Sequence, residues 1–589
     1  MTEGTAPAPP APASADPAGA PVRGWRSAFP PLRWLAEYRP RWLAGDLVAG
    51  LTLAAYGIPV SLAYATLAGL PPHYGIYGYL FGGLGYALFG SSRQLAVGPT
   101  SAISMLVGTT VAGMAGGDPA RWAEIAALTA AVVAALSLLA WIFKLSSLIA
   151  FISETILLGF KAGAALVIAM TQLPKLFGVP GGGEHFFERA AILAGQLGDT
   201  QLPVLGFGLA ALAVMLLGEK LLPGRPVALL VVIGSIVAVS ATALGTIGLT
   251  TVGELPGGLP ALHWPALRVR DVDGVVPLAF ACFLLAYIEG VSAARALADR
   301  HGQSIDPRQE LLGLCGANLL AAVGQAYPVA GGLSQSSVND KAGARTPLAL
   351  VFASGAIALV LLFLTGLLAN LPSVVLAAIV LVAVKGLIKV TELRELWRIS
   401  RFEFGVAAVA FVGVLVEGIL RGIILAAIVS ILLLIRRAAR PNVAILGRIP
   451  GTRRYSDLER HPENERIPGG LIVRIEAGLL YFNVEHVRDQ IGKALAALPA
   501  RPRFVVADLS NSPLVDLAGA RMLSRLNDEL AALGVRLRVA EAHASVRDTL
   551  RAAGLAERVG GVHRSTTLEA VIEEEITAQS GDVAPSVAR

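Results

Sequence analysis

The sequence contains little charge and almost no cysteine. Only 15% of its 589 residues are charged, whereas a soluble protein carries about a quarter. The two cysteines, Cys282 and Cys315, lie in apolar stretches, which excludes a disulfide framework and a metal site with cysteine ligands. A nucleophile–base pair, a metal-ligand cluster and a nucleotide-binding loop are also missing from the sequence. We therefore expect no enzyme, no cofactor and no metal site.

Apolar residues make up 54% of the chain. They recur in runs of about twenty residues, the length at which a helix crosses a bilayer. This pattern predicts a polytopic α-helical membrane protein in contact with membrane lipid. The net charge of +6 comes mainly from arginines at the ends of these runs and in the last part of the chain. Membrane topology explains such arginines, so no nucleic-acid partner is expected.

The apolar runs form two halves of about seven spans each, separated by the polar stretch Gly253–Asp273. The spans expected in the first half are Leu47–Leu67 with a break at Gly57–Pro59, Tyr77–Phe89, a short span from Thr100, Trp122–Phe143, Leu148–Leu173, Pro203–Leu221 and Val227–Leu249. Those expected in the second half are Pro277–Leu297, Gln309–Gln325, the interrupted segment Tyr327–Pro347, Leu348–Leu368, Ser373–Leu387, Phe404–Val416 and Arg421–Ile435.

Because seven is an odd number, the two halves must be inverted relative to each other, and both termini lie on one side of the membrane. Arginines precede the first span, and Arg436, Arg437 and Arg440 follow the last one. These residues predict that both termini are cytoplasmic, in a multi-pass protein of the plasma (inner) membrane.

Composition divides the chain into four parts. Residues 1–32 form an alanine- and proline-rich tail that we expect to be disordered, residues 33–440 form the transmembrane domain, and 578–589 form a second disordered tail. Residues 441–577 have the composition of a soluble domain. The strands expected there are Leu471–Ile475, Phe504–Leu509 and Val535–Ala540, and the helices are Val484–Leu498, Leu517–Leu533, Ala544–Ala553 and Thr567–Ile576. Alternating strands and helices predict a small α/β domain.

Two polar segments interrupt the apolar pattern at corresponding places in the two halves. In Ser91–Met105 an extended piece ends at Gly98-Pro99, and Thr100-Ser101 begin an apolar helix. In Tyr327–Pro347 the pair Gly331-Gly332 precedes a short helix, for which Ser334 is the expected N-cap. Paired interruptions of this kind indicate the binding site of a transporter. Two helix N-termini that point at one place would attract an anion, so we expect a small inorganic or organic anion there.

The candidate anion-binding residues come from these segments and from two neighbouring spans. They are Tyr56, Gly98, Thr100, Ser101, Ser334, Gln335, Ser336 and Lys161. The serine hydroxyls either bind the anion or only cap their helices. Tyr56 and Tyr64 of the first span either line the site or pack in the core.

Two ionisable residues are expected at membrane depth. Glu289 in the eighth span is the candidate for coupling to H⁺ or Na⁺, and the alternative is a carboxyl group that only packs between helices. Lys161, near the middle of the fifth span, either supplies positive charge to the anion or forms a structural ion pair with Glu289 or Glu154.

Three stretches resemble the sulfate permease family, the bacterial relatives of solute carrier family 26. They are Gly57–Gly78 (GIPVSLAYATLAGLPPHYGIYG), Ser91–Met105 (SSRQLAVGPTSAISM) and Gly332–Ala349 (GLSQSSVNDKAGARTPLA). A fourth stretch, Val505–Gly519 (VVADLSNSPLVDLAG), resembles the STAS domain shared with anti-sigma-factor antagonists.

The resemblance implies a seven-plus-seven inverted repeat with a core domain and a gate domain, the transmembrane fold that nucleobase permeases share. It places an anion such as sulfate, bicarbonate or a dicarboxylate between the third and tenth spans, and it implies a homodimer. Many family members carry arginine where this sequence has Gln335. In the STAS domain, Ala518 occupies the position of the phosphorylatable serine, so a phosphoswitch is excluded there. The domain then either stabilises the dimer or docks a cytosolic partner.

The favoured function is secondary active anion transport by an elevator-like motion of the core against the gate. Two alternatives stay open. An anion channel would give currents far above the turnover of a carrier, and a membrane receptor that signals through the STAS domain would bind an anion without moving it.

Overall fold

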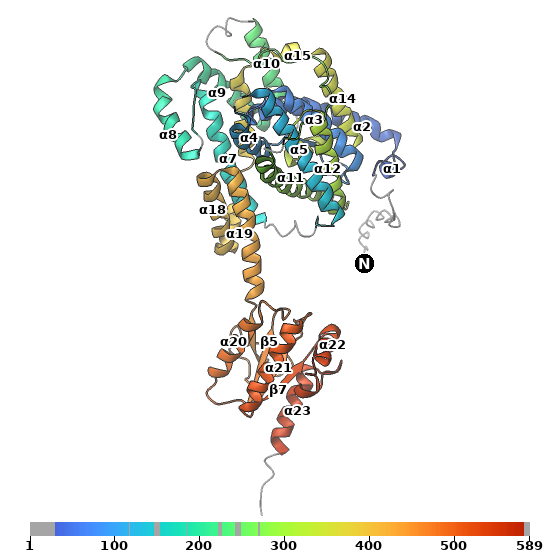
Figure 1. Ribbon diagram of the computed structural model, residues 1–589, viewed down its shortest axis with the longest axis vertical. Coiled ribbons are helices and arrows are strands. Elements are labelled where there is room, and N and C mark those ends of the chain that lie inside the picture. Colours follow the sequence, from blue (N-terminus) through green and yellow to red (C-terminus); the bar gives the residue numbers. More distant parts are fainter. Residues whose placement is uncertain are drawn as a thin grey trace, which may run out of the picture. The chain divides into compact units, whose positions relative to one another are not determined.

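The computed structural model describes residues 30–116, 118–146, 154–183, 185–221, 226–241, 249–268 and 271–581 (Figure 1). The chain divides into two compact units, Met1–Ser430 and Ile431–Arg589, and each is described by itself. Most of the two expected tails, the start of the fifth expected span and the end of the seventh lie outside the described residues. Helix α1 (Pro31–Trp34) and helix α23 (Leu568–Gly581) reach into the described edges of the two expected tails.

A helix coincides with every span that was expected. The helices of the first half are α2 (Leu43–Leu67), α3 (His73–Phe89), α4 (Ser101–Ala115), α5 (Pro119–Ile142), α7 (Glu154–Phe177), α9 (Leu202–Leu221) and α10 (Val227–Ala241). Those of the second half are α11 (Val272–His301), α12 (Pro307–Val323), α13 (Leu333–Lys341), α14 (Leu348–Phe363), α15 (Thr365–Leu368), α16 (Ser373–Lys385), α18 (Arg401–Glu417) and α19 (Ile419–Ala439). Among the described residues, 6 helices are long and apolar enough to cross a membrane, and α4, α10 and α14 are shorter apolar helices.

The break expected in the first span is wrong. Helix α2 runs continuously from Leu43 to Leu67, with Pro59 inside it. Gly57 is needed for close packing instead of a break, because a Cβ atom at this position would lie 2.8 Å from Cζ of Tyr79. Two amphipathic helices, α8 (Phe186–Gln196) and α17 (Val390–Ile399), were not predicted from the sequence.

The two halves make matched contacts. In chain order, α2, α3, α4 and α5 of the first half correspond to α11, α12, α13 and α14 of the second. Helix α3 packs on α14, and its counterpart α12 packs on α5. In the same way α2 contacts α13, and its counterpart α11 contacts α4. Buried aspartates repeat this relation. Asp46 in α2 accepts hydrogen bonds from the backbone N–H groups of Arg345 and Thr346, just before α14. Asp271, the N-cap of α11, pairs with Arg121 at the start of α5, with 2.6 Å between Nη2 and Oδ1.

Packing separates the first unit into two sets of helices. One set, the core group, comprises α2–α5 and α11–α14, and the other, the gate group, comprises α7, α9, α10, α16 and α18. Figure 1 shows α7, α9 and α18 to one side of α2, α3, α12 and α14. The two groups meet where α10 and α16 contact α2, and where α7 and α16 contact α4.

The second unit is a five-stranded sheet covered by helices on both faces. The strand order is β4 (Tyr455–Asp457), β3 (Val443–Arg448), β5 (Gly470–Ile475), β6 (Phe504–Asp508) and β7 (Arg536–Ala540), and β5, β6 and β7 are parallel. Helices α20 (Val484–Ala496), α21 (Leu517–Ala532) and α22 (Ala544–Ala552) cover one apolar face, and α23 covers the other. The three expected strands correspond to β5, β6 and β7, whereas β3 and β4 were not expected.

Candidate functional site

The two interrupted segments cross each other in the middle of the core group. Strand β1 (Val97–Gly98) pairs antiparallel with β2 (Ala330–Gly331), so that Val97 faces Gly331 and Gly98 faces Ala330. Helix α4 begins three residues after β1, and α13 begins two residues after β2. Both helices therefore begin within three residues of the same two-residue ladder.

Glycine is required at this crossing because other chains come very near. A Cβ atom on Gly98 would lie 2.6 Å from Cδ2 of Tyr79. One on Gly331 would lie 2.8 Å from Leu95 and 3.1 Å from the Cα atom of Gly290 in α11. Such distances are below normal contact, so the two-residue ladder can form only without these side chains.

No side chain caps either of the two helices. The N-cap of α4 is Thr100, in an extended conformation, and the N-cap of α13 is Gly332. The expectation that Ser334 is the N-cap is therefore wrong, because Ser334 is the second residue of α13 and its side chain is exposed. The first N–H groups of a helix have no partner within the helix and carry partial positive charge. Two such ends at one crossing form a place that favours an anion.

The hydroxyl of Thr100 is the clearest candidate for direct contact with an anion. Within the described part of the chain, its Oγ1 atom is buried and has no hydrogen-bond partner. A buried hydroxyl without a partner is costly, which indicates that a ligand or water completes it.

Tyr64 of α2 lies next to the following residue, Ser101. Ser101 is buried and within hydrogen-bonding reach of Tyr64, which in turn lies close enough to Tyr56, Tyr327 and Glu289 to interact with them electrostatically. Tyr64 is thus at the N-terminus of α4, and Tyr56 lies near Tyr64.

Gln335 and Ser336 stabilise the crossing by hydrogen bonds to its backbone. The amide nitrogen of Gln335 donates to the carbonyl oxygens of Ala96 and Ala330, each at 3.1 Å. The Ser336 hydroxyl accepts from the N–H group of Ala96 at 2.8 Å and donates to the carbonyl of Gly332 at 2.7 Å. Both side chains are buried and bonded to backbone at the crossing and at the start of α13, which gives them a structural role there.

Lys161 and Glu289 form an ion pair. The Nζ atom of Lys161 lies 3.5 Å from Oε1 of Glu289, and the two side chains are 26% and 11% exposed. Glu289 is also close enough to Tyr64 to interact with it electrostatically. Of the alternatives left open by the sequence, the structure shows the pairing with Glu289.

Tyr79 and Ser104 lie at the crossing but were not predicted from the sequence. The ring of Tyr79 lies against Gly57 and Gly98, and its hydroxyl is buried without a partner among the described residues. The Ser104 hydroxyl lies 3.0 Å from that of Tyr327. No sequence signal separates these residues from tyrosines and serines that only pack. The described residues contain no group of three or more His, Cys, Asp or Glu side chains placed to hold a metal ion.

In the second unit, Asp516 caps α21 by accepting a hydrogen bond of 2.8 Å from the N–H group of Gly519. Ala518, which has no hydroxyl to phosphorylate, occupies the second position of this helix.

Comparisons with known proteins agree with this architecture. The profile of the sulfate permease family matches residues 43–410, and that of the STAS domain matches residues 461–571. A probable sulfate transporter of Mycobacterium tuberculosis strain H37Rv is 33% identical over 550 residues, which cover 93% of this chain and 98% of that protein. The chloroplastic sulfate transporter 4.1 of Arabidopsis thaliana is 31% identical over 552 residues, covering 90% and 80% of the two chains.

Solved structures show the same fold. Murine solute carrier 26 family member A9, an anion transporter in the inward-facing state, superposes with a TM-score of 0.85 at 23% identity and covers 95% of this chain and 96% of its own. The transmembrane domain of the cyanobacterial bicarbonate transporter BicA gives a TM-score of 0.58 at 20% identity, with 67% of this chain and 98% of its own covered. The named relatives are transporters and not enzymes. The chain belongs to the sulfate permease family and carries a STAS domain in its second unit.

Proposed function

We propose that this protein is a secondary active anion transporter that holds its substrate between the N-termini of α4 and α13. The observation that carries the proposal is the crossing of β1 and β2, which brings two uncapped helix N-termini together beside the unpartnered Thr100 hydroxyl. Backbone N–H groups and hydroxyls are suited to the oxygen atoms of an oxyanion. The names of the relatives support sulfate first and bicarbonate second, with dicarboxylates as the third class to test.

The arrangement of the helices supports alternating access by movement of the core group against the gate group. The crossing lies in the core group, and the matched contacts of the two halves are those expected from an inverted repeat. Inverted repeats commonly move as rigid bodies around a site near the membrane midplane. The gate group contacts the core group mainly along α2 and α4, the two helices that flank the site.

Glu289 is the proposed coupling residue for H⁺ or Na⁺. Its carboxylate is nearly buried, lies beside Tyr64 and belongs to the core group. A carboxylate at membrane depth is the usual device for linking the movement of a cation to that of a substrate. We also propose cytoplasmic termini, a homodimer and a location in the plasma membrane, on the basis of the flanking arginines and the family.

Uptake into proteoliposomes tests the function. Labelled sulfate, bicarbonate and a C4-dicarboxylate would be offered with and without inward gradients of H⁺ and Na⁺. We expect saturable uptake of one of these anions that is accelerated by one gradient. Ser334→Ala removes an exposed hydroxyl at the N-terminus of α13, whereas Thr100 caps α4, so this variant asks whether a hydroxyl of the other helix end matters. Binding without uptake would favour a receptor, and currents far above carrier turnover would favour a channel.

A further inference from the structure

The ion pair between Lys161 and Glu289 joins the two helix groups. Lys161 is on α7 of the gate group, and Glu289 is on α11 of the core group. An ion pair across a boundary that moves can be intact in only some conformations. This inference rests on the proposed function, because it requires the two groups to move.

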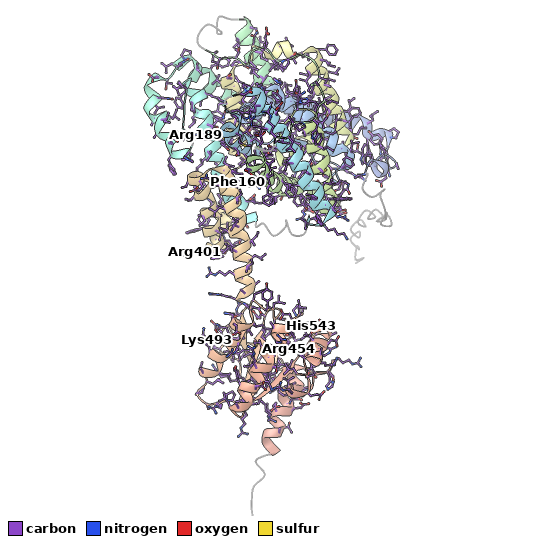
Figure 2. The ribbon with its side chains drawn as sticks, in the orientation of Figure 1. Phe160, Arg189, Arg401, Arg454, Lys493 and His543 are labelled. Atoms are coloured by element: carbon purple, nitrogen blue, oxygen red, sulfur yellow. The ribbon has the colours of Figure 1, made fainter. Side chains whose placement is uncertain are left out.

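Helix α7 is fixed in the gate group by glycines on one face. A Cβ atom at Gly159 would lie 1.9 Å from the carbonyl oxygen of Ala407, and one at Gly163 would lie 2.9 Å from that of Phe411, both in α18. Small residues four apart allow this close helix packing in membranes. Lys161 lies two residues from each glycine, about 200° around the helix, so its side chain leaves α7 on the side away from α18. Figure 2 labels its buried neighbour Phe160 on this helix.

Glu289 is fixed in the core group by the crossing. The next residue, Gly290, approaches so near that a Cβ atom on Gly331 of β2 would lie 3.1 Å from its Cα atom. Glu289 itself lies beside Tyr64 of α2. Any displacement of the crossing with its bound anion therefore moves the carboxylate away from, or toward, the lysine of the gate group.

We propose that Lys161 is a positioning residue that acts through Glu289. In the present conformation it neutralises the carboxylate beside the anion site and holds α11 against α7. When the core group moves, the pair separates and Glu289 loses its counter-ion. Lys161 thus favours the conformation described here, and its removal should shift the equilibrium between conformations by up to about fivefold, as expected for a partly exposed ion pair.

Distances between spin labels on the two groups test this proposal in the full-length protein. The labels would be attached at Leu359→Cys in α14 and Val409→Cys in α18, both exposed, after replacement of Cys282 and Cys315 by serine. We expect Lys161→Met and Glu289→Gln each to increase a second population of distances, and the double variant to add nothing further. Lys161→Arg should retain the original distribution. The exchange of charges, Lys161→Glu with Glu289→Lys, should restore most of it.

Lys175→Met, at an exposed lysine near the end of the same helix, is the control and should leave the distances unchanged. Unchanged distances in Lys161→Met, or effects of the two single variants that add in the double variant, would overturn the proposal. Sulfate uptake by the parent protein is measured separately. If uptake is normal while the distances do not respond, the role of Lys161 fails alone. If no anion is transported, the proposed function fails, whatever the spin labels report.

Discussion

Replacing Thr100 by valine should have opposite effects on stability and on anion binding. Valine has nearly the shape of threonine but no hydroxyl, and the Thr100 hydroxyl is buried without a partner in the described structure. Its removal breaks no hydrogen bond to another described residue. If the hydroxyl donates to the anion, the same change removes a donor from the bound state.

The structure gives the size of both effects. A buried polar group without a partner costs about 1–3 kcal/mol, so the anion-free variant should be as stable as the parent protein or more stable by about 1 kcal/mol. A hydrogen bond to a charged group contributes about 1.5–3 kcal/mol, so the affinity for the anion should fall by about ten- to a hundredfold.

Thermal unfolding in detergent, with and without sulfate, measures both quantities, because a ligand of the folded state raises the unfolding temperature. Ser336→Ala is the matched control. Its hydroxyl bonds to the backbone at Ala96 and Gly332, so this variant should lose about 1–2 kcal/mol of stability without anion. A Thr100→Val protein that is clearly less stable without anion, or that binds sulfate as tightly as the parent, would refute the reasoning.

Three further predictions concern coupling and the second unit. Glu289→Gln keeps the shape of the side chain but cannot ionise, so uptake driven by a gradient of H⁺ or Na⁺ should be lost while sulfate binding persists; accumulation at the parental rate would show that Glu289 is structural. A chain that ends at Pro441 should still bind sulfate, because every proposed site residue precedes it; a well-folded truncation without binding would contradict this. In the second unit, burial and the hydrogen bond to Glu569 raise the pKa of Tyr455 to about 12. A raised pKa means that its stabilisation is complete below the ordinary value near 10 and disappears as the pH rises through 12. The urea-unfolding free energy of residues 431–589 should therefore fall over this range, and less so in Tyr455→Phe; equal slopes would exclude the effect.

The positions of the helices follow well from the sequence because apolar runs and glycine pairs are local signals. The interruptions at Gly98 and Gly331 predict that the two segments approach each other, and the crossing is found there. Gly57 misleads the same reasoning. A glycine two residues before a proline is typical of a helix break. At position 57, however, glycine is needed because the ring of Tyr79 leaves no room for a Cβ atom. The local sequence does not reveal this contact.

The orientation of side chains around the crossing could not be predicted in the same way. Gln335 and Ser336 belong to the same polar run as Ser334, yet they bond to the backbone at Ala96, more than two hundred positions earlier in the chain, while Ser334 is exposed. Likewise, the ion pair of Lys161 depends on how α7 and α11 come together. Residue type identified these candidates. Only the tertiary contacts distinguish the side chains that bond to backbone at the crossing from those at the uncapped N-termini of α4 and α13.

The position of a bound anion is the decisive observation for the proposed site. Selenate, which has the geometry of sulfate and a strong anomalous signal, would be added to crystals of the full-length protein. We predict a selenium peak between the N-termini of α4 and α13, within hydrogen-bonding distance of the Thr100 hydroxyl. A peak elsewhere in the membrane domain, or none between these helix ends at saturating selenate, would contradict the assignment of the site.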